Sequence, residues 1–164
     1  MTVTKIYLDM DGVLCDFEKK FTEYYGKASL EKRDRKEWSK DWQDFILDKK
    51  GFEKLEWFPG GRELLSFLKN HPNIHVEILS SSGGEKYHGE VTVQKIKWLK
   101  SHGIHYKANI VPGRKKKAEY ATSDSLIIDD TPEVIRYFTQ AGGQAILHKD
   151  IKDTLKQLDS LLNK

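Results

Sequence analysis

Short apolar runs recur along the chain and alternate with segments whose apolar residues repeat at helical spacing. The runs are too short for helices and too uniformly apolar for strands with one solvent-exposed face, so they predict buried strands. These predicted strands cover residues 6–8, 76–79, 110–111, 126–128 and 145–147. Helical patterns cover residues 61–68, 93–103 (through Val93, Ile96 and Leu99), 134–138 and 151–162. The alternation predicts an α/β fold with a doubly wound parallel sheet.

One connection is too long for a simple crossover. Residues 9–75 separate the first two predicted strands, about twice what a whole strand-helix-strand unit requires. We interpret residues 16–58 as a small helical cap inserted after the first strand, and residues 1–15 and 59–164 as the core domain. Ten of the chain's 18 aromatic residues fall in the cap: Phe17, Phe21, Tyr24, Tyr25, Trp38, Trp42, Phe45, Phe52, Trp57 and Phe58. Most of them are expected to build its apolar core.

The charge of the chain is nearly balanced and its excess is local. Among 164 residues, 28 are Lys or Arg and 25 are Asp or Glu, which gives a net charge of +3. Four cations are consecutive, at Arg114, Lys115, Lys116 and Lys117, and without them the balance is −1. This pattern disfavours a general polyanion-binding surface, so stable nucleic-acid binding is not expected, but it marks a candidate phosphate site.

The composition also bears on the cellular setting. The single cysteine, Cys15, excludes an internal disulfide bond and a multi-cysteine zinc site. No stretch has the roughly 18 apolar residues of a membrane helix, and the first residues lack the apolar core of a signal peptide. We therefore expect a cytoplasmic protein without a membrane partner, in which carboxylates hold any metal.

Two predicted strands run directly into paired carboxylates. The first leads into Asp9, Asp11 and Gly12, and the fourth leads into Asp129 and Asp130. In an open parallel sheet, ligands bind beyond the carboxyl ends of the strands, so these residues stand where a site is expected. The alternatives are structural: Asp9 capping a helix that begins near Val13, and the second pair capping a helix at Pro132.

If these two strands are neighbours, several anions meet within a few ångströms. Each like-charge pair then costs roughly 4 kcal/mol at 4 Å and an effective dielectric near 20. A divalent cation removes this cost, and oxygen ligands with open water positions favour Mg²⁺, which commonly bridges to substrate phosphate.

Two further segments offer groups for a phosphate. Ser80, Ser81, Ser82 and Gly83 follow the second strand, and their hydroxyls and backbone amides suit phosphate oxygens; the alternative is a simple loop. The basic run opens a predicted helix, in which Lys117 is the first candidate for a site lysine and Lys116 the second. The alternative for that run is a solvent-facing surface.

Together, Asp9-x-Asp11-Gly12, Ser80, Lys117 and Asp129-Asp130 resemble, in this order, the four motifs of the haloacid dehalogenase (HAD) superfamily of phosphatases. The resemblance implies a Rossmann-like five-stranded sheet of order 3-2-1-4-5 with a cap after the first motif. It implies that Asp9 forms an aspartyl phosphate and that Asp11 is the general acid and base. Mg²⁺ would be held by Asp9, Asp11, Asp129 and Asp130, while Ser80 and Lys117 neutralise the phosphoryl oxygens.

Residues 9–18 are similar to the 5′(3′)-deoxyribonucleotidase branch of that superfamily, as are residues 51–65, 95–99 and 141–143. This similarity implies a nucleoside monophosphate substrate, with Phe17 at the base and Gly12, Ser81 and Ser82 as further substrate contacts. The chain departs from the branch at Ser80–Gly83, where a Thr-Ser-Pro style motif is usual, and at Thr131, where the branch has arginine.

Other functions remain open at this point. The chain can be a phosphatase for another small phosphate ester or for nucleic-acid ends. It can also be a binding module that keeps the fold without turnover, or a nucleic-acid-binding protein that uses residues 114–117. Its oligomeric state, monomer or homodimer, is open.

Overall fold

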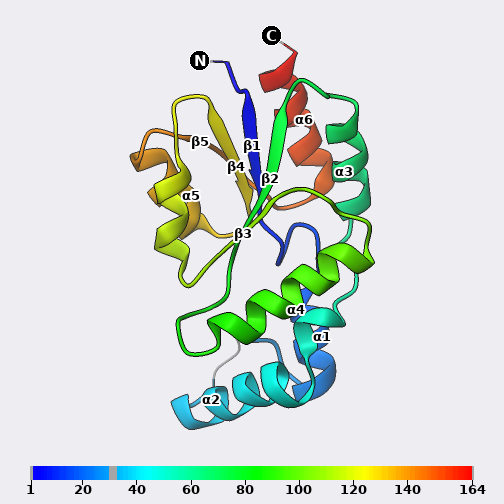
Figure 1. The fold of residues 1–164 in the computed structure, drawn as a ribbon, viewed down its shortest axis with the longest axis vertical. Helices are drawn as coiled ribbons and strands as arrows, with labels where there is room; N and C mark the ends of the chain where they lie inside the picture. Colours follow the sequence, from blue (N-terminus) through cyan, green and yellow to red (C-terminus); the bar gives the residue numbers. More distant parts are fainter. Residues whose placement is uncertain (1, 30–32, 164) are drawn as a thin grey trace.

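A five-stranded parallel sheet forms the centre of the molecule (Figure 1). The computed structural model describes residues 2–29 and 33–163, so residues 1 and 164 of the predicted core and 30–32 of the predicted cap lie outside the described residues. The strand order is β3-β2-β1-β4-β5, as the resemblance implied. All five predicted strands are present: β1 (Lys5–Leu8), β2 (His75–Ser81), β3 (Ala108–Val111), β4 (Ser125–Asp129) and β5 (Gln144–Leu147).

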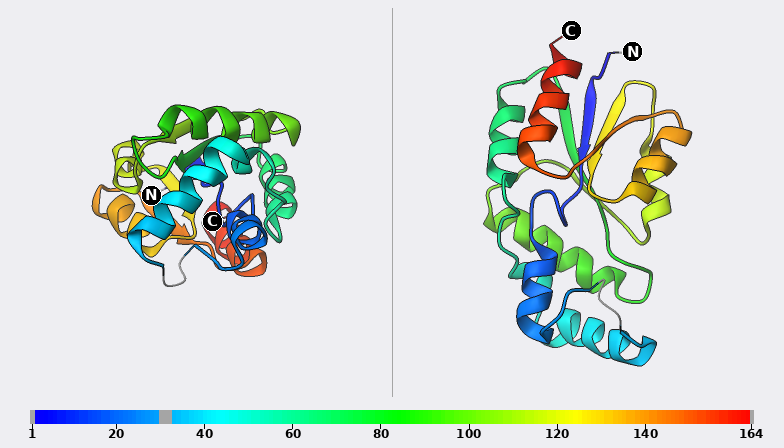
Figure 2. Two further views of the ribbon diagram at one scale, coloured as in Figure 1. Left: turned by 90° about the horizontal axis from the view of Figure 1, so that it is seen from below. Right: turned by 180° about the vertical axis from the view of Figure 1, so that it is seen from behind.

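Helices cover both faces of the sheet (Figures 1 and 2). On one face lie α3 (Gly61–Lys69) and α6 (Ile151–Leu162), and on the other lie α5 (Pro132–Gln140) and the 3₁₀ helix η3 (Arg114–Tyr120). Side chains of β1 alternate between these faces, so that Leu8 packs in the α3 and α6 layer while Tyr7 packs in the other. The predicted helices at 61–68, 134–138 and 151–162 are confirmed.

The inserted segment lies at the carboxyl ends of the strands, whereas both chain ends lie at the opposite end of the sheet (Figure 1). It contains α1 (Phe17–Tyr25), α2 (Arg35–Gln43), the π-helical turn η1 (Asp44–Asp48) and the 3₁₀ turn η2 (Gly51–Glu53). The two connections between this segment and the sheet pair with each other. The backbone N–H of Phe58 donates to Leu14 (2.8 Å), and that of Asp16 donates to Glu56 (2.9 Å).

The helix α4 (His88–Ser101) runs between the sheet and the inserted segment (Figure 1). Its predicted apolar face is confirmed at Leu99 and wrong at Val93, which is 53% exposed. The buried side chains are Val91, Gln94, Lys95, Trp98 and Leu99. Two of these side chains bind backbone groups of the insert: Gln94 Nε2 donates to Ile46 O (2.7 Å) and Trp98 Nε1 donates to Leu55 O (2.8 Å).

The aromatic side chains of the insert form a continuous core. Phe21 and Phe45 are fully buried, and they belong to the same apolar cluster as Leu8 of the sheet. This agrees with the expectation that most of these rings are structural. Among the described residues, no helix is both long enough and apolar enough to cross a membrane.

Candidate functional site

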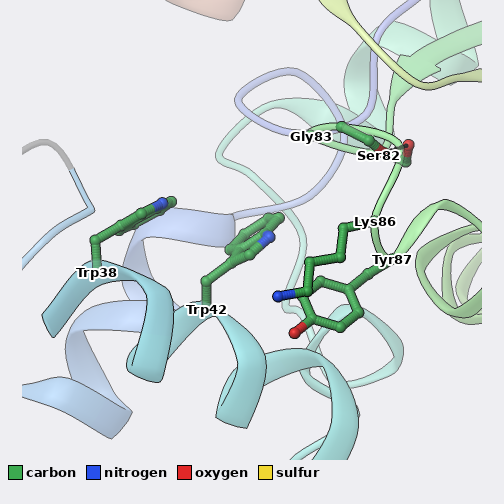
Figure 3. A pocket seen from close by; sticks show the side chains of 7 residues that line it. Trp38, Trp42, Ser82, Gly83, Lys86 and Tyr87 are labelled. Carbon is green, nitrogen blue, oxygen red and sulfur yellow. Dashed lines mark hydrogen bonds between the residues drawn. The ribbon is translucent and has the colours of Figure 1, made fainter. Parts of the chain in front are cut away.

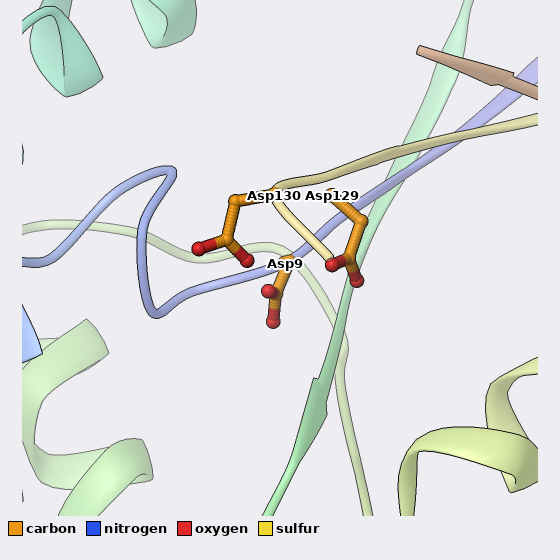
Figure 4. Close-up of side chains that lie close together, drawn as sticks. All are labelled: Asp9, Asp129 and Asp130. Atoms are coloured by element: carbon orange, nitrogen blue, oxygen red, sulfur yellow. The ribbon is translucent and has the colours of Figure 1, made fainter. Parts of the chain in front are cut away.

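The neighbouring strands β1 and β4 bring the two aspartate motifs together. Leu8 lies opposite Ile128 in the parallel register, so Asp9 and Asp129 follow side by side. The backbone N–H of Asp9 donates to Ile128 O (3.0 Å), which continues the ladder into the site. One carboxylate oxygen from each of Asp9, Asp129 and Asp130 lies within 4.8 Å of the others, and Figure 4 shows the three side chains converging.

A buried lysine bridges the two strands at this point. Lys117 Nζ lies 2.6 Å from Asp129 Oδ2 and 3.1 Å from Asp9 Oδ1. The predicted helix that carries it is the 3₁₀ helix η3. Within the basic run only Lys117 is buried, whereas Arg114, Lys115 and Lys116 are exposed. Of the two candidate lysines, the structure therefore brings Lys117, and not Lys116, to the carboxylates.

The crowding of charges changes the acidity of these groups. Burial and the charge of Asp9 raise the pKa of Asp129 to about 6, although Lys117 opposes the shift. Loss of part of its water shell and the charges of Asp9 and Asp129 raise the pKa of Asp130 to about 7. Burial alone would lower the pKa of Lys117, but the two carboxylates beside it raise it to about 12. The cluster of three carboxylates thus has one close cation, Lys117, which pairs with Asp9 and Asp129, and this leaves room for further positive charge.

Gly12 allows Asp130 to reach this cluster. The φ angle of Gly12 is +80°, and a Cβ atom at that position would lie 2.0 Å from Asp130 Oδ2. The structure does not support Asp9 as a helix cap near Val13, because the next helix, α1, begins at Phe17 and is capped by Asp16. At the other motif the N-cap of α5 is Thr131, whose N–H donates to Asp129 Oδ1 (3.0 Å).

The chemistry of this donor set fits a hard divalent cation. All the donor atoms are carboxylate oxygens, which Mg²⁺ prefers over nitrogen or sulfur ligands. Burial is the largest cause of the raised pKa values of Asp129 and Asp130, and the negative charge of Asp9 adds to both shifts. Asp9, Asp129 and Asp130 are the described residues that could hold the ion.

A second buried lysine enters the site from α4. Lys95 Nζ lies 2.9 Å from Asp11 Oδ2, 2.7 Å from Ser80 Oγ and 2.9 Å from the backbone oxygen of Ser81. Ser80 and Ser81 are the last residues of β2, so they belong to a strand end and not to a loop. One ammonium group therefore joins the end of β2 to Asp11, which follows β1.

Lys95 is missing from the residues predicted from the sequence. A lysine in a helix is normally solvent-facing, and this one is 1% exposed. The spacing of Lys95 from its apolar neighbours could have predicted its burial. It follows Val91 by four residues and precedes Trp98 by three, so it shares the face of two apolar side chains.

The turn after β2 and the helix α2 enclose a cavity of about 220 Å³ (Figure 3). The rings of Trp38 and Trp42 stack at an interplanar angle of 17° and face the turn. Ser82 is buried, and its Oγ lies 2.7 Å from His88 Nδ1, so this hydroxyl is already engaged. The lining residues are Trp38, Trp42, Ser82, Gly83, Gly84, Lys86 and Tyr87.

Phe17 does not line this cavity. Its ring is half-buried, stacks on Phe52 (5.5 Å between centroids) and contacts Trp42 edge-on (6.0 Å). It therefore supports a ring that lines the cavity. The predicted contact of Phe17 with a base stays a prediction.

Several solved structures share this fold. A hydrolase from Pseudomonas syringae has a TM-score of 0.61 at 15% identity, over 98% of this chain and 99% of that chain. A hydrolase from Streptococcus pneumoniae TIGR4 has a TM-score of 0.57 at 17% identity, over 97% and 100%. A HAD family enzyme from Bacteroides thetaiotaomicron has a TM-score of 0.55 at 13% identity, over 96% and 99%. No curated protein matches the sequence.

One family model matches nearly the whole chain. It is described as "5' nucleotidase, deoxy (Pyrimidine), cytosolic type C protein" and covers residues 2–153. The matched region contains both aspartate motifs, both buried lysines and the whole sheet. The chain therefore belongs to the 5′ nucleotidase, deoxy (pyrimidine), cytosolic type C family, and it is a phosphatase of the HAD superfamily.

Proposed function

We propose that the protein hydrolyses the phosphomonoester of nucleoside monophosphates, with Mg²⁺ as cofactor and Asp9 as nucleophile. The observation that carries this proposal is the contact of Lys117 with both Asp9 and Asp129 at the ends of neighbouring strands. This contact places a buried positive charge beside the proposed nucleophile, and a positive charge there favours binding of an anionic phosphate. We also propose the cytoplasm as the location, in line with the cytosolic type in the family description.

Asp9 is held in a position that suits attack on phosphorus. Its Oδ1 accepts from the backbone N–H of Met10 (2.8 Å) and lies close to Lys117. Within the part of the chain that the structure describes, no hydrogen bond is seen to Oδ2, so this oxygen is available. It would form the new bond to phosphorus while the bond to the leaving oxygen breaks, which splits hydrolysis into two easier steps.

Asp11 suits the role of general acid and base. It stands two residues after Asp9 on the same turn, and 30% of its side chain is exposed, so it can exchange protons with water. It would protonate the leaving oxygen and then remove a proton from the water that hydrolyses the aspartyl phosphate. Lys95 would orient this carboxylate and, with Ser80 and Lys117, neutralise charge on the phosphoryl oxygens.

Asp9, Asp129 and Asp130 would hold the Mg²⁺, with the backbone carbonyl of Asp11 as a further ligand by resemblance to the family. When bound, Mg²⁺ supplies positive charge that lowers repulsion between the carboxylates and the phosphate. The close approach of Asp130 past Gly12 supports its place in this set.

The cavity beside Ser82 suits the nucleoside part of the substrate. Aromatic rings offer flat faces for a base, and each stacked base contributes roughly 1 to 3 kcal/mol. Trp38, Trp42 and Tyr87 line the cavity, and Phe17 supports Trp42 from behind. We retain Phe17, Gly12, Ser81 and Ser82 as proposed substrate contacts, and we add the three rings.

Phosphate release from a panel of nucleoside monophosphates and sugar phosphates, with Mg²⁺ or with EDTA, tests this function. We expect Mg²⁺-dependent release that is fastest with nucleotides. Replacing Trp42 with alanine should raise KM for nucleotides more than for sugar phosphates. Equal rates for nucleotides and sugar phosphates would contradict the proposed substrate, and metal-independent release would contradict the proposed cofactor.

A further inference from the structure

The exposed part of the basic run, next to Lys117 in sequence, contributes to a positively charged strip. The strip comprises Arg114, Lys115 and Lys116 of η3 together with Arg136 of α5, and all four side chains are exposed. Both elements pack on the same face of the sheet, the one that α5 covers in Figure 1. Tyr137 joins the two elements, because Lys115 Nζ lies 5.9 Å and Arg136 Cζ 5.2 Å from the centre of its ring.

These cations are not neutralised within the described part of the chain. No salt bridge involves any of the four, whereas Lys117, next in sequence, makes two. The same two elements carry two exposed carboxylates, Glu119 and Glu133, so the cations are in excess. Such a local excess of positive charge attracts anions to this surface.

The geometry of η3 places Arg114 on the same side as Lys117. Because η3 is a 3₁₀ helix, residues three apart lie above one another, and three residues advance the backbone by about 6 Å. Lys117 contacts the carboxylate cluster. Helical geometry therefore puts the exposed Arg114 one turn before Lys117 on the same side of η3. Lys115 and Lys116 point in other directions around the helix.

We propose that Arg114 binds a second phosphate of the substrate, one that stays intact while the first reacts at Asp9. This inference rests on the proposed function, and it extends the substrate from nucleoside monophosphates to nucleotides that carry a second phosphate group. A guanidinium can bind two phosphate oxygens at once, which suits this role better than an ammonium does. Lys115, Lys116 and Arg136 add attraction at longer range.

Two kinds of molecule carry a phosphate at such a position. One is a nucleoside 3′,5′-bisphosphate, and the other is a phosphorylated end of single-stranded nucleic acid, in which the next backbone phosphate is the second group. Both molecules present a second phosphate group to Arg114. They differ in the number of further phosphates that can reach Lys115, Lys116 and Arg136.

Calorimetric titration of the Asp9→Asn protein with Mg²⁺ separates binding from turnover. The probes are thymidine 5′-monophosphate, thymidine 3′,5′-bisphosphate and a 5′-phosphorylated thymidine trinucleotide. We expect the bisphosphate to bind about tenfold more tightly than the monophosphate, as one additional charged hydrogen-bonded contact provides. Adding Arg114→Gln to the Asp9→Asn protein should remove this preference. The affinity for the monophosphate should stay within about twofold of that of the Asp9→Asn protein alone.

Lys116→Gln is the matched control, because it removes one charge from the adjacent residue on another side of the helix. It should retain most of the preference. A trinucleotide that binds more tightly than the bisphosphate, with an affinity that falls steeply with salt, identifies nucleic-acid ends as the ligand. Equal binding of these two probes identifies the small bisphosphate.

Hydrolysis assays on the wild-type protein distinguish a failure of this inference from a failure of the proposed function. If thymidine monophosphate is hydrolysed but the bisphosphate has no advantage, or keeps it in Arg114→Gln, the inference about Arg114 is wrong and the proposed function stands. If no probe is hydrolysed while Arg114 still sets the preference for two phosphates, the proposed function is wrong and the binding site stands.

Discussion

Lys95 Nζ lies 2.9 Å from Asp11 Oδ2, so a side chain from α4, the helix between sheet and insert, reaches the first aspartate motif. The same ammonium group binds Ser80 and lies 5.1 Å from the ring centre of Phe52 in the insert. One buried charge thus contacts two strand ends and the inserted segment.

Replacing Lys95 with methionine should lower kcat by about 100-fold, the usual effect of losing one donor to a developing oxyanion. Methionine keeps most of the apolar length, and Asp11 remains in contact with water, so the fold should persist. Lys97→Met, on an exposed residue of the same helix, is the control and should keep normal kcat. Steady-state phosphate release measures both, and a nearly unchanged kcat in Lys95→Met would contradict the role of Lys95.

Replacing Gly12 with alanine should displace Asp130. The new Cβ would overlap Asp130 Oδ2, and the positive φ angle adds about 1 to 2 kcal/mol of strain. We expect weaker Mg²⁺ binding and lower activity. Gly89→Ala is the control, because nothing lies within 4 Å of its added Cβ, and it should behave as wild type. A Gly12→Ala protein with normal Mg²⁺ affinity would rule out this explanation for the glycine.

Mg²⁺ should raise the melting temperature, because a ligand that binds only the folded state stabilises it by about 2.7 kcal/mol at 100 times its Kd. Asp130→Asn should shift this response to higher Mg²⁺ concentration without unfolding the protein, since residue 130 is at the surface. Asp159→Asn, an exposed change in α6, should leave the response unaltered. Thermal melts across a Mg²⁺ titration measure this, and the absence of any Mg²⁺ response in the wild type would contradict the metal site.

Glu77 should make stability depend on acid pH. Burial opposes its charge, but hydrogen bonds from Asn109, His75 and Lys5 outweigh that effect and lower the pKa of Glu77 to about 2 from 4.5. Because the folded pKa is the lower one, this stabilisation is complete above pH 4.5 and is lost as pH falls towards 2.

Glu77→Gln should therefore cost about 1 to 2 kcal/mol of unfolding free energy at pH 7, after allowance for solvent screening, and progressively less below pH 4.5. Urea unfolding at several pH values measures the difference. Glu63→Gln, an exposed glutamate of α3, should show little effect at any pH. A cost for Glu77→Gln that does not change between pH 7 and pH 3 would show that the ion pair is not its source.

Much of the fold and half of the site follow from the sequence because they depend on order along the chain. Apolar runs that end in Asp9 and Asp129 are readable as buried strands, and the parallel arrangement then places both ends at one edge. Lys117 was also predictable, since it is the member of the basic run nearest the apolar side of its helix. These features need no knowledge of how distant segments pack.

The rest depends on tertiary contacts. Lys95 is buried only because α4 is enclosed between sheet and insert, which also explains why Val93 was wrongly assigned to the buried face. The cavity likewise forms between α2 and the turn after β2, two segments about forty residues apart in sequence. The backbone of this turn lies close to the ring of Trp42. Gly83 allows this approach, because a Cβ at that position would lie 2.8 Å from Trp42.

The central claim is that Asp9 accepts the phosphoryl group, and trapping of the covalent intermediate tests it most directly. The protein is mixed with Mg²⁺ and a nucleoside monophosphate labelled in its phosphate, quenched with acid and digested. We predict label on the peptide that contains Asp9, and none on the Asp9→Asn protein. Label on a different residue, or full turnover by Asp9→Asn, would contradict the account.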